Sequence, residues 1–215
     1  MIFKLDEKDT LFPPPELADD DGLLAVGGDL SPRRLINAYS QGIFPWYSDE
    51  TPILWYSPHE RFVLFPHKVK ISRSMEQVIR SGKFSITLNK AFEDVIRECS
   101  GKTRKDQDGT WITQDMRDAY IRLHSLGIAH SVEVWHEGNL MGGLYGVSAG
   151  KVFCGESMFS HASNASKMAL IWLCQTQEYQ LIDCQIESEH LTRLGAEIIS
   201  REEYLKFLLP NSVYP

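Results

Sequence analysis

Alternating apolar and polar positions predict a group of strands in the C-terminal half of this 215-residue chain. Residues 130–135, 140–147 and 151–159 have the two-residue period of strands, and turn-forming residues separate them. We expect these segments to form an antiparallel meander. A helix should follow the polar run 160–166, and another apolar strand should cover residues 181–185.

Helical periodicity dominates the remaining segments, and capping residues mark where each helix begins. Ser31, Ser72, Asn89 and Thr113 are the candidate N-caps, and residues 84–88 read as a strand between two helices. The expected helices cover residues 32–41, 72–81, 90–99, a segment after Thr113 and a closing stretch near 201–208. The combination predicts an α+β fold.

Residues 43–66 differ from the rest of the chain because they are dense in aromatic residues and prolines. The prolines exclude a helix and allow only short or edge strands. The rings could fill a core or stack on a planar ligand, and we expect at least one to be exposed. The change in composition predicts a small N-terminal domain at 1–62 and a catalytic domain at 63–215.

The composition is that of a globular protein, with 43% hydrophobic residues. The charged, interrupted N-terminal stretch predicts no signal peptide, and no apolar run is long enough to predict a membrane span, so we expect a cytoplasmic protein. The cysteines are scattered and read as reduced thiols, not as disulfides or metal ligands: Cys99, Cys154, Cys174 and Cys184.

Charge is distributed unevenly along the sequence. The whole chain carries −7, yet residues 61–105 hold 11 basic and 4 acidic residues. This basic segment could be a footprint for a polyanion on an otherwise acidic protein, or a set of solvated helix faces. Its cations are Arg61, Lys68, Lys70, Arg73, Arg80, Lys83, Lys90, Arg97, Lys102, Arg104 and Lys105.

Three polar side chains interrupt strands that are otherwise apolar. Glu156 lies in the strand that ends the meander, where strict alternation puts it on one face with Met158 and puts Phe159 on the other. Asp183 and Gln185 share a face of the last apolar strand. A carboxylate in a strand interior is costly unless it is paired or faces a cleft. Either acid could mark a strand edge or end, but the two together favour a functional site.

Several long segments resemble the bacterial leucyl/phenylalanyl-tRNA protein transferase family. They are GLLAVGGDL (22–30), GIFPWY (42–47), ILWYSP (53–58), ISRSM (71–75), GTWIT (109–113), FCGESMFS (153–160) and LIDCQ (181–185). The resemblance implies transfer of Leu or Phe, less often Met, from aminoacyl-tRNA to proteins with N-terminal Arg or Lys, which marks them for degradation by the N-end rule. It also implies a catalytic domain like the GCN5-related N-acetyltransferases, with a mixed, mainly antiparallel sheet flanked by helices. No metal or organic cofactor is implied.

The resemblance also implies roles for the polar residues. The family's Asp and Gln at the positions of Asp183 and Gln185 act together on the acceptor amine. A neutral amide is a very weak base, so we expect Asp183 to supply charge and Gln185 either to orient the amine or to transmit a proton through its carbonyl. Glu156 is expected to pair with the acceptor's basic side chain.

Other residues are candidates for substrate binding. A deformable apolar pocket for Leu and Phe is expected from Leu144, Phe153, Met158, Phe159 and Ile182. The resemblance implies that Trp46 and Trp111 surround the terminal adenosine of the tRNA. It further implies that basic residues of the 72–84 region hold the tRNA backbone, which here means Arg73 and Arg80, with Lys83 as a further candidate.

Two other classes of function remain open at this stage. An acetyl-CoA-dependent N-acetyltransferase would share the expected fold, but the joint at 160–166 lacks the Gly-rich pyrophosphate loop that this chemistry usually needs. A noncatalytic protein that binds tRNA or peptide N-termini would use the same residues without turnover.

Overall fold

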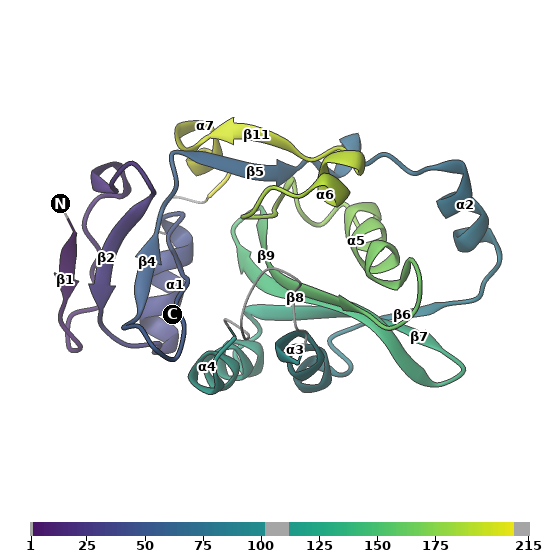
Figure 1. Cartoon of the computed structure of the whole chain (residues 1–215), viewed down its shortest axis with the longest axis horizontal. Helices are drawn as coiled ribbons and strands as arrows, with labels where there is room; N and C mark the ends of the chain where they lie inside the picture. Colours follow the sequence, from purple (N-terminus) through teal and green to yellow (C-terminus); the bar gives the residue numbers. More distant parts are fainter. Residues whose placement is uncertain (1, 102–111, 209–215) are drawn as a thin grey trace.

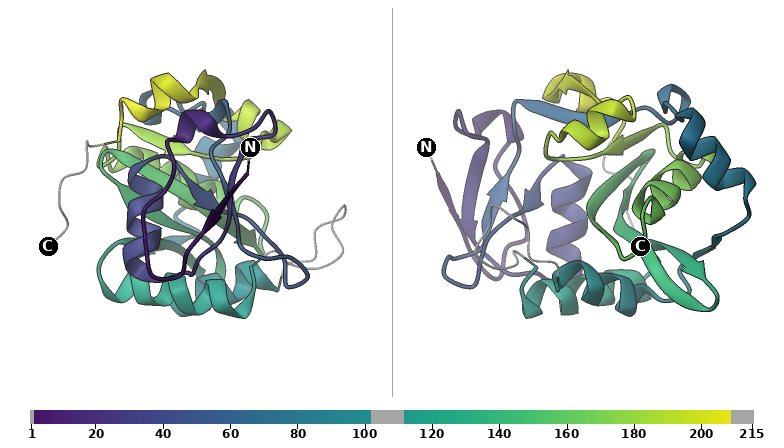
Figure 2. Two further views of the ribbon diagram at one scale, coloured as in Figure 1. Left: turned by 90° about the vertical axis from the view of Figure 1, so that its left-hand side faces the viewer. Right: turned by 45° about the vertical axis from the view of Figure 1, so that its right-hand side comes forward.

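The protein contains two sheets, which a computed structural model describes over residues 2–101 and 112–208. The smaller sheet belongs to the N-terminal part and has the order β1-β2-β4-β3. Its strands are β1 (Phe3–Leu5), β2 (Leu23–Gly27), β3 (Phe44–Pro45) and β4 (Leu54–Tyr56). It stands beside one end of the larger sheet, with helix α1 (Pro32–Ser40) between them (Figures 1 and 2).

The larger sheet has seven strands in the order β11-β5-β10-β9-β8-β7-β6. These strands are β5 (Glu60–Leu64), β6 (Ser85–Leu88), β7 (Ala129–His136), β8 (Asn139–Ala149), β9 (Val152–Ser160), β10 (Leu181–Asp183) and β11 (Glu197–Ser200). Among the described strands of this sheet, only the β9–β10 pair is parallel. The expected meander is β7, β8 and β9. The predicted α+β fold with a mixed, mainly antiparallel sheet is confirmed.

Helices cover both faces of the larger sheet. Helices α3 and α4 lie on one face and α5 lies on the other, while α2 stands at the end of the molecule far from the N-terminal sheet (Figure 1). The helices beyond α1 are α2 (Arg73–Arg80), α3 (Phe92–Ser100), α4 (Gln114–Ser125), α5 (Ala165–Gln175), α6 (Glu189–Arg193) and α7 (Arg201–Leu205). Among the described residues, no helix is both long and apolar enough to cross a membrane.

Three of the four predicted N-caps are confirmed. The hydroxyls of Ser31, Ser72 and Thr113 each accept the backbone N–H three residues on. Asn89 is not a cap, because its backbone has a φ of +58° and helix α3 begins later, at Phe92. The carboxylate of Glu133, on β7, accepts the backbone N–H groups that precede this helix instead.

The hydrophobic core forms two clusters, one on each face of the larger sheet. One cluster continues from the larger sheet into the N-terminal sheet, so that Trp55 and Val152 belong to the same core. The chain passes from the smaller sheet to the larger one at residues 57–59, and the predicted boundary at 62/63 falls inside β5. The N-terminal part and the rest of the chain are therefore joined by a shared hydrophobic core as well as by the backbone.

Candidate active site

A cavity of about 470 Å³ opens where the N-terminal sheet meets strands β9 and β10. Its volume is within the range of pockets for small organic molecules. The N-terminal part contributes Asp21, Phe44, Pro45, Trp46, Tyr56 and Pro58. The larger sheet and its helices contribute Leu144, Phe153, Gly155, Glu156, Ser157, Met158, Ser166, Leu170, Ile182, Asp183, Cys184, Gln185, Ile186, Ser188, His190 and Leu191.

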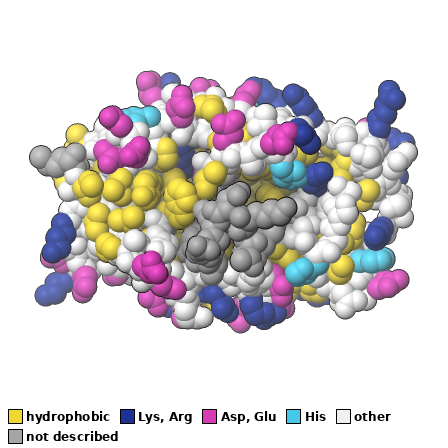
Figure 3. Space-filling view, viewed as in Figure 1, with side chains coloured by type: hydrophobic (Ala, Val, Ile, Leu, Met, Phe, Trp, Pro, Cys, Tyr) yellow, Lys and Arg dark blue, Asp and Glu magenta, His cyan; other side chains and the backbone are white. Residues whose placement is uncertain are grey.

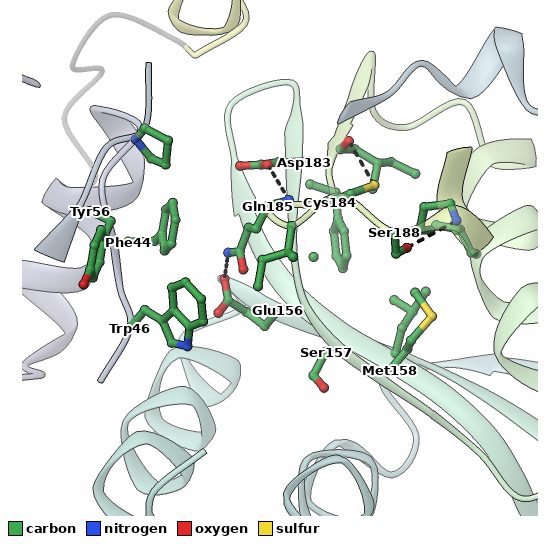
Figure 4. A pocket seen from close by; sticks show the side chains of 18 of the residues that line it. Phe44, Trp46, Tyr56, Glu156, Ser157, Met158, Asp183, Cys184, Gln185 and Ser188 are labelled. Carbon is green, nitrogen blue, oxygen red and sulfur yellow. Dashed lines mark hydrogen bonds between the residues drawn. The ribbon is translucent and has the colours of Figure 1, made fainter. Parts of the chain in front are cut away.

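Aromatic, polar and apolar side chains occupy different parts of this cavity. Phe44, Trp46 and Tyr56 form an aromatic wall on one side, and Met158 lies at the opposite side (Figure 4). The side chains of Gln185 and Glu156 lie between them and are joined by a hydrogen bond from Gln185 Nε2 to Glu156 Oε1 of 2.9 Å (Figure 4). Leu144, Phe153 and Ile182 pack in one cluster with Met158 and also line the cavity, and we call these four residues the apolar chamber. The polar side chains of Asp21, Ser157, Ser166, Ser188 and His190 complete the lining.

Gln185 is held in a strained turn directly after β10. Its φ is +59°, a conformation that side-chain-bearing residues adopt rarely and at a cost of about 1 kcal/mol. The backbone N–H of Ile186 donates to the carbonyl of Cys184 at 2.7 Å, which makes Gln185 the centre of a γ-turn. The turn directs the Gln185 side chain toward Glu156 (Figure 4).

The side chain of Asp183 stabilises this turn. Its carboxylate is fully buried, and its Oδ1 accepts the backbone N–H of Gln185 at 3.0 Å, two residues ahead. Its Oδ2 forms an ion pair with the guanidinium of Arg61, on β5. Asp183 contacts the backbone of Gln185, and the side-chain amide of Gln185 bonds to Glu156 instead.

Glu156 is the centre of a buried hydrogen-bond network. Only 5% of its surface is exposed, and its carboxyl contacts the hydroxyls of Tyr39 at 2.7 Å and Tyr120 at 3.1 Å. Burial raises the pKa of the Glu156 carboxyl to about 7, although the hydrogen bonds from the two tyrosines oppose the rise. Burial, with the charge of Glu156, also raises the pKa of both phenols well above the usual value.

A β-bulge on β9 changes which of its side chains face the cavity, and one predicted pocket residue does not line it. Tyr145 pairs with Ser157 and Gly146 with Gly155, so Glu156 is an extra residue in its strand. Beyond the bulge, Met158 packs with the cluster that lines the cavity, and Phe159 packs in the cluster on the opposite face. The expectation that Phe159 lines the pocket is therefore wrong.

The cavity brings together most of the other predicted residues. Leu144, Phe153, Met158 and Ile182 line it, as do Trp46 and the three polar candidates. Trp111 lies outside the described residues.

The predicted tRNA contacts lie elsewhere. Arg73, Arg80 and Lys83 are exposed on and just after α2, and Lys and Arg side chains project at that end of the molecule (Figure 3). Arg61 was counted among the surface cations of the basic segment, but it is buried beside Asp183.

Three residues of the site were not expected from the sequence: Tyr39, Tyr120 and Arg61. The tyrosines occupy core positions on α1 and α4, where their rings fit the apolar stripe. A buried phenol needs a hydrogen-bond partner, so two tyrosines in apolar stripes were a signal that a buried acceptor exists. The partner of Arg61 lies 122 positions along the chain, and no local pattern indicates such a pair.

Two family models match this chain. Residues 63–209 match the model described as leucyl/phenylalanyl-tRNA protein transferase, and residues 28–59 match the model of that family's N-terminal domain. The catalytic candidates all fall within the longer match.

Curated relatives extend the similarity over nearly the whole chain. A leucyl/phenylalanyl-tRNA–protein transferase from Syntrophobacter fumaroxidans is 55% identical and covers 98% of this chain and 91% of its own length. One from Syntrophus aciditrophicus is 57% identical and covers 90% and 82%. A solved structure with a distant likeness is a GCN5-related N-acetyltransferase from Kribbella flavida, at 9% identity and a TM-score of 0.38, covering 77% of this chain and 60% of that chain.

Proposed function

This chain belongs to the leucyl/phenylalanyl-tRNA protein transferase family of aminoacyltransferases, and we propose that it transfers Leu or Phe, less often Met, from aminoacyl-tRNA to proteins with N-terminal Arg or Lys. The product would be a protein marked for N-end rule degradation in the cytoplasm. One observation carries the proposal: the polar pair Gln185–Glu156 lies between an aromatic wall and an apolar chamber in one cavity.

The two sides of the cavity fit the two ends of an aminoacyl-adenosine. In our proposal the adenine stacks on Trp46, with Trp111 as a second ring, because indoles stack well on bases. The apolar chamber takes the amino-acid side chain, and the flexible Met158 adapts it to ligands of two shapes. The ester carbonyl then lies beside Gln185, midway between the two ends.

The reaction proposed here forms an amide from an ester. The α-amine of the acceptor has a pKa of about 8 and attacks in its unprotonated form. Its nitrogen bonds to the ester carbonyl carbon, the bond from that carbon to the ribose oxygen breaks, and the amine's proton passes to that oxygen. Gln185 Nε2 donates to Glu156, so its Oε1 is the atom we assign to accept a hydrogen bond from the amine and orient its lone pair.

Glu156 would select for a basic acceptor. Its pKa of about 7 means that the carboxyl is only partly ionised near neutral pH. A guanidinium or ammonium group placed beside it lowers that pKa and ionises the carboxyl, whereas a neutral side chain gives no such compensation. The charge that binds Arg or Lys thus forms most fully when the cation arrives.

A transfer assay tests this function. Radiolabelled Phe-tRNA is supplied with matched peptides that begin with Arg, Lys or Ala, and we expect label to enter the Arg and Lys peptides but not the Ala peptide. Gln185→Ala should abolish most turnover while tRNA binding survives. If the wild-type protein instead consumed acetyl-CoA with the Arg peptide and left Phe-tRNA intact, the N-acetyltransferase alternative would replace ours. Binding without turnover would identify a noncatalytic protein.

A further inference from the structure

Arg61 joins three parts of the molecule at a point directly behind the cavity. From β5, its Nη1 donates to the carbonyl of Gly42, two residues after the end of α1, at 2.8 Å. Its Nη2 forms the ion pair with Asp183 on β10. The guanidinium carbon also lies 5.0 Å from the ring centre of Phe44 and 4.2 Å from that of Tyr204. These contacts leave the guanidinium one orientation.

The orientation of Arg61 fixes the carboxylate of Asp183. Both groups are buried, at 2% and 0% exposure, so water cannot replace either partner. With Oδ2 held by Arg61, Oδ1 is left to accept the backbone N–H of Gln185. That hydrogen bond opposes the tendency of Gln185 to leave its strained γ-turn, which is intrinsically unfavourable.

We propose that Arg61 is a positioning residue for the transfer reaction, acting through Asp183 to hold Gln185 in the turn that presents its amide to the cavity. The inference rests on the proposed function. It gives Asp183 a positioning role as well, because the structure joins its carboxylate to the backbone of Gln185 and to Arg61. The negative charge of Asp183 then matters because it pairs with Arg61.

Charge-neutral replacement of the pair tests this role. Asp183→Asn alone leaves Arg61 as an unpaired buried cation, which strongly disfavours the native arrangement. The double variant Arg61→Gln/Asp183→Asn removes both charges and keeps an oxygen that can accept the Gln185 N–H. We expect its kcat for Phe transfer to an Arg peptide to exceed that of Asp183→Asn by about 10-fold or more. A double variant that regains thermal stability but not kcat would overturn the proposal, since the charge itself would then be required.

Arg61→Lys gives a second measurement if the double variant does not fold. An ammonium group keeps the charge but lacks the fork that contacts Gly42 and Asp183 together. We expect kcat to fall about 10- to 100-fold with little change in KM for Phe-tRNA. Unchanged kcat per folded enzyme would overturn the proposal. Inactivity of the wild-type protein in the same assay would instead contradict the proposed function.

The control is an Arg–Asp pair in which the arginine is buried and the side chain of the aspartate is 40% exposed. Arg34 is fully buried and its Nε bonds to Asp29 at 2.9 Å, away from the residues that line the cavity. Arg34→Lys and the double variant Arg34→Gln/Asp29→Asn should lower the melting temperature without changing kcat. Loss of kcat in these variants to the extent seen at Arg61 would show that the assay reports general destabilisation.

Discussion

At the scale of single residues, the network around Glu156 indicates the protonation state of its carboxyl. If the carboxyl were ionised, the network would contain more close oxygen–oxygen contacts than hydroxyl protons to bridge them. The hydroxyl of Tyr39 lies 2.5 Å from that of Tyr120, and each hydroxyl also contacts the carboxyl of Glu156. Two phenols provide two protons for these three contacts. A protonated carboxyl provides the third and closes a ring of hydrogen bonds, in agreement with the pKa of about 7.

Glu156→Gln should therefore remove a dependence of stability on pH. The pKa of the carboxyl rises from 4.5 to about 7 on folding, so its contribution to stability is full below pH 4.5 and is lost as pH rises through 7. The loss amounts to about 3 kcal/mol relative to the Gln variant, whose amide stays neutral and can complete the same ring. Urea unfolding of both proteins between pH 4.5 and 8 measures the difference. Parallel curves would show that Glu156 does not titrate in this range.

At the scale of helices and strands, local signals predicted most elements and failed where a partner is distant in sequence. Ser31, Ser72 and Thr113 marked helix starts because a cap bonds within its own turn. The predicted start of helix α3 at residue 90 is wrong, because α3 begins at Phe92 and the N–H groups before it donate to Glu133 on strand β7. The faces of β9 were misread beyond Glu156, since a bulge depends on pairing with β8 and alternation along one strand does not reveal it.

Gly146 provides a test of the packing around that bulge. A Cβ at this position would lie 2.2 Å from the carbonyl oxygen of Cys154 and 2.6 Å from the ring of Phe153. Gly146→Ala should destabilise the protein by about 3 kcal/mol, because a backbone atom cannot move aside as a side chain can. Gly101→Ala is the control, since its new Cβ would meet nothing closer than 3.7 Å and its φ is −78°. Equal melting temperatures for the two variants would contradict this packing.

At the scale of the whole molecule, the site exists only where the two sheets meet. The aromatic wall comes from β3, the residue after it and β4. Glu156 comes from β9, Gln185 from the turn after β10, and the apolar chamber from β8, β9 and β10. Glu156, Asp183 and Gln185 could be singled out from the sequence because polar residues in apolar strands are unusual. Arg61 could not, because its burial results from packing between distant segments.

The cations of α2 lie far from this junction, at the opposite end of the molecule from the N-terminal sheet (Figure 1). In the proposed function they contact the tRNA body, not the aminoacyl-adenosine in the cavity. Replacing Arg73 and Arg80 with Gln should weaken aminoacyl-tRNA binding and reduce the slope of log affinity against log salt by about 2. Transfer from an aminoacyl-adenosine fragment should not change.

Exposed lysines at the other end of the molecule provide the matched control for this prediction. Lys4 and Lys8 lie in the segment that contains β1, and their replacement with Gln removes the same charge from the chain. Because salt dependence reports the phosphates that a cation neutralises, this variant should keep the wild-type slope. Equal slopes for the two double variants would mean that net charge, and not a tRNA path across α2, governs binding. Reduced transfer from the adenosine fragment in the α2 variant would instead show that the helix supports the cavity itself.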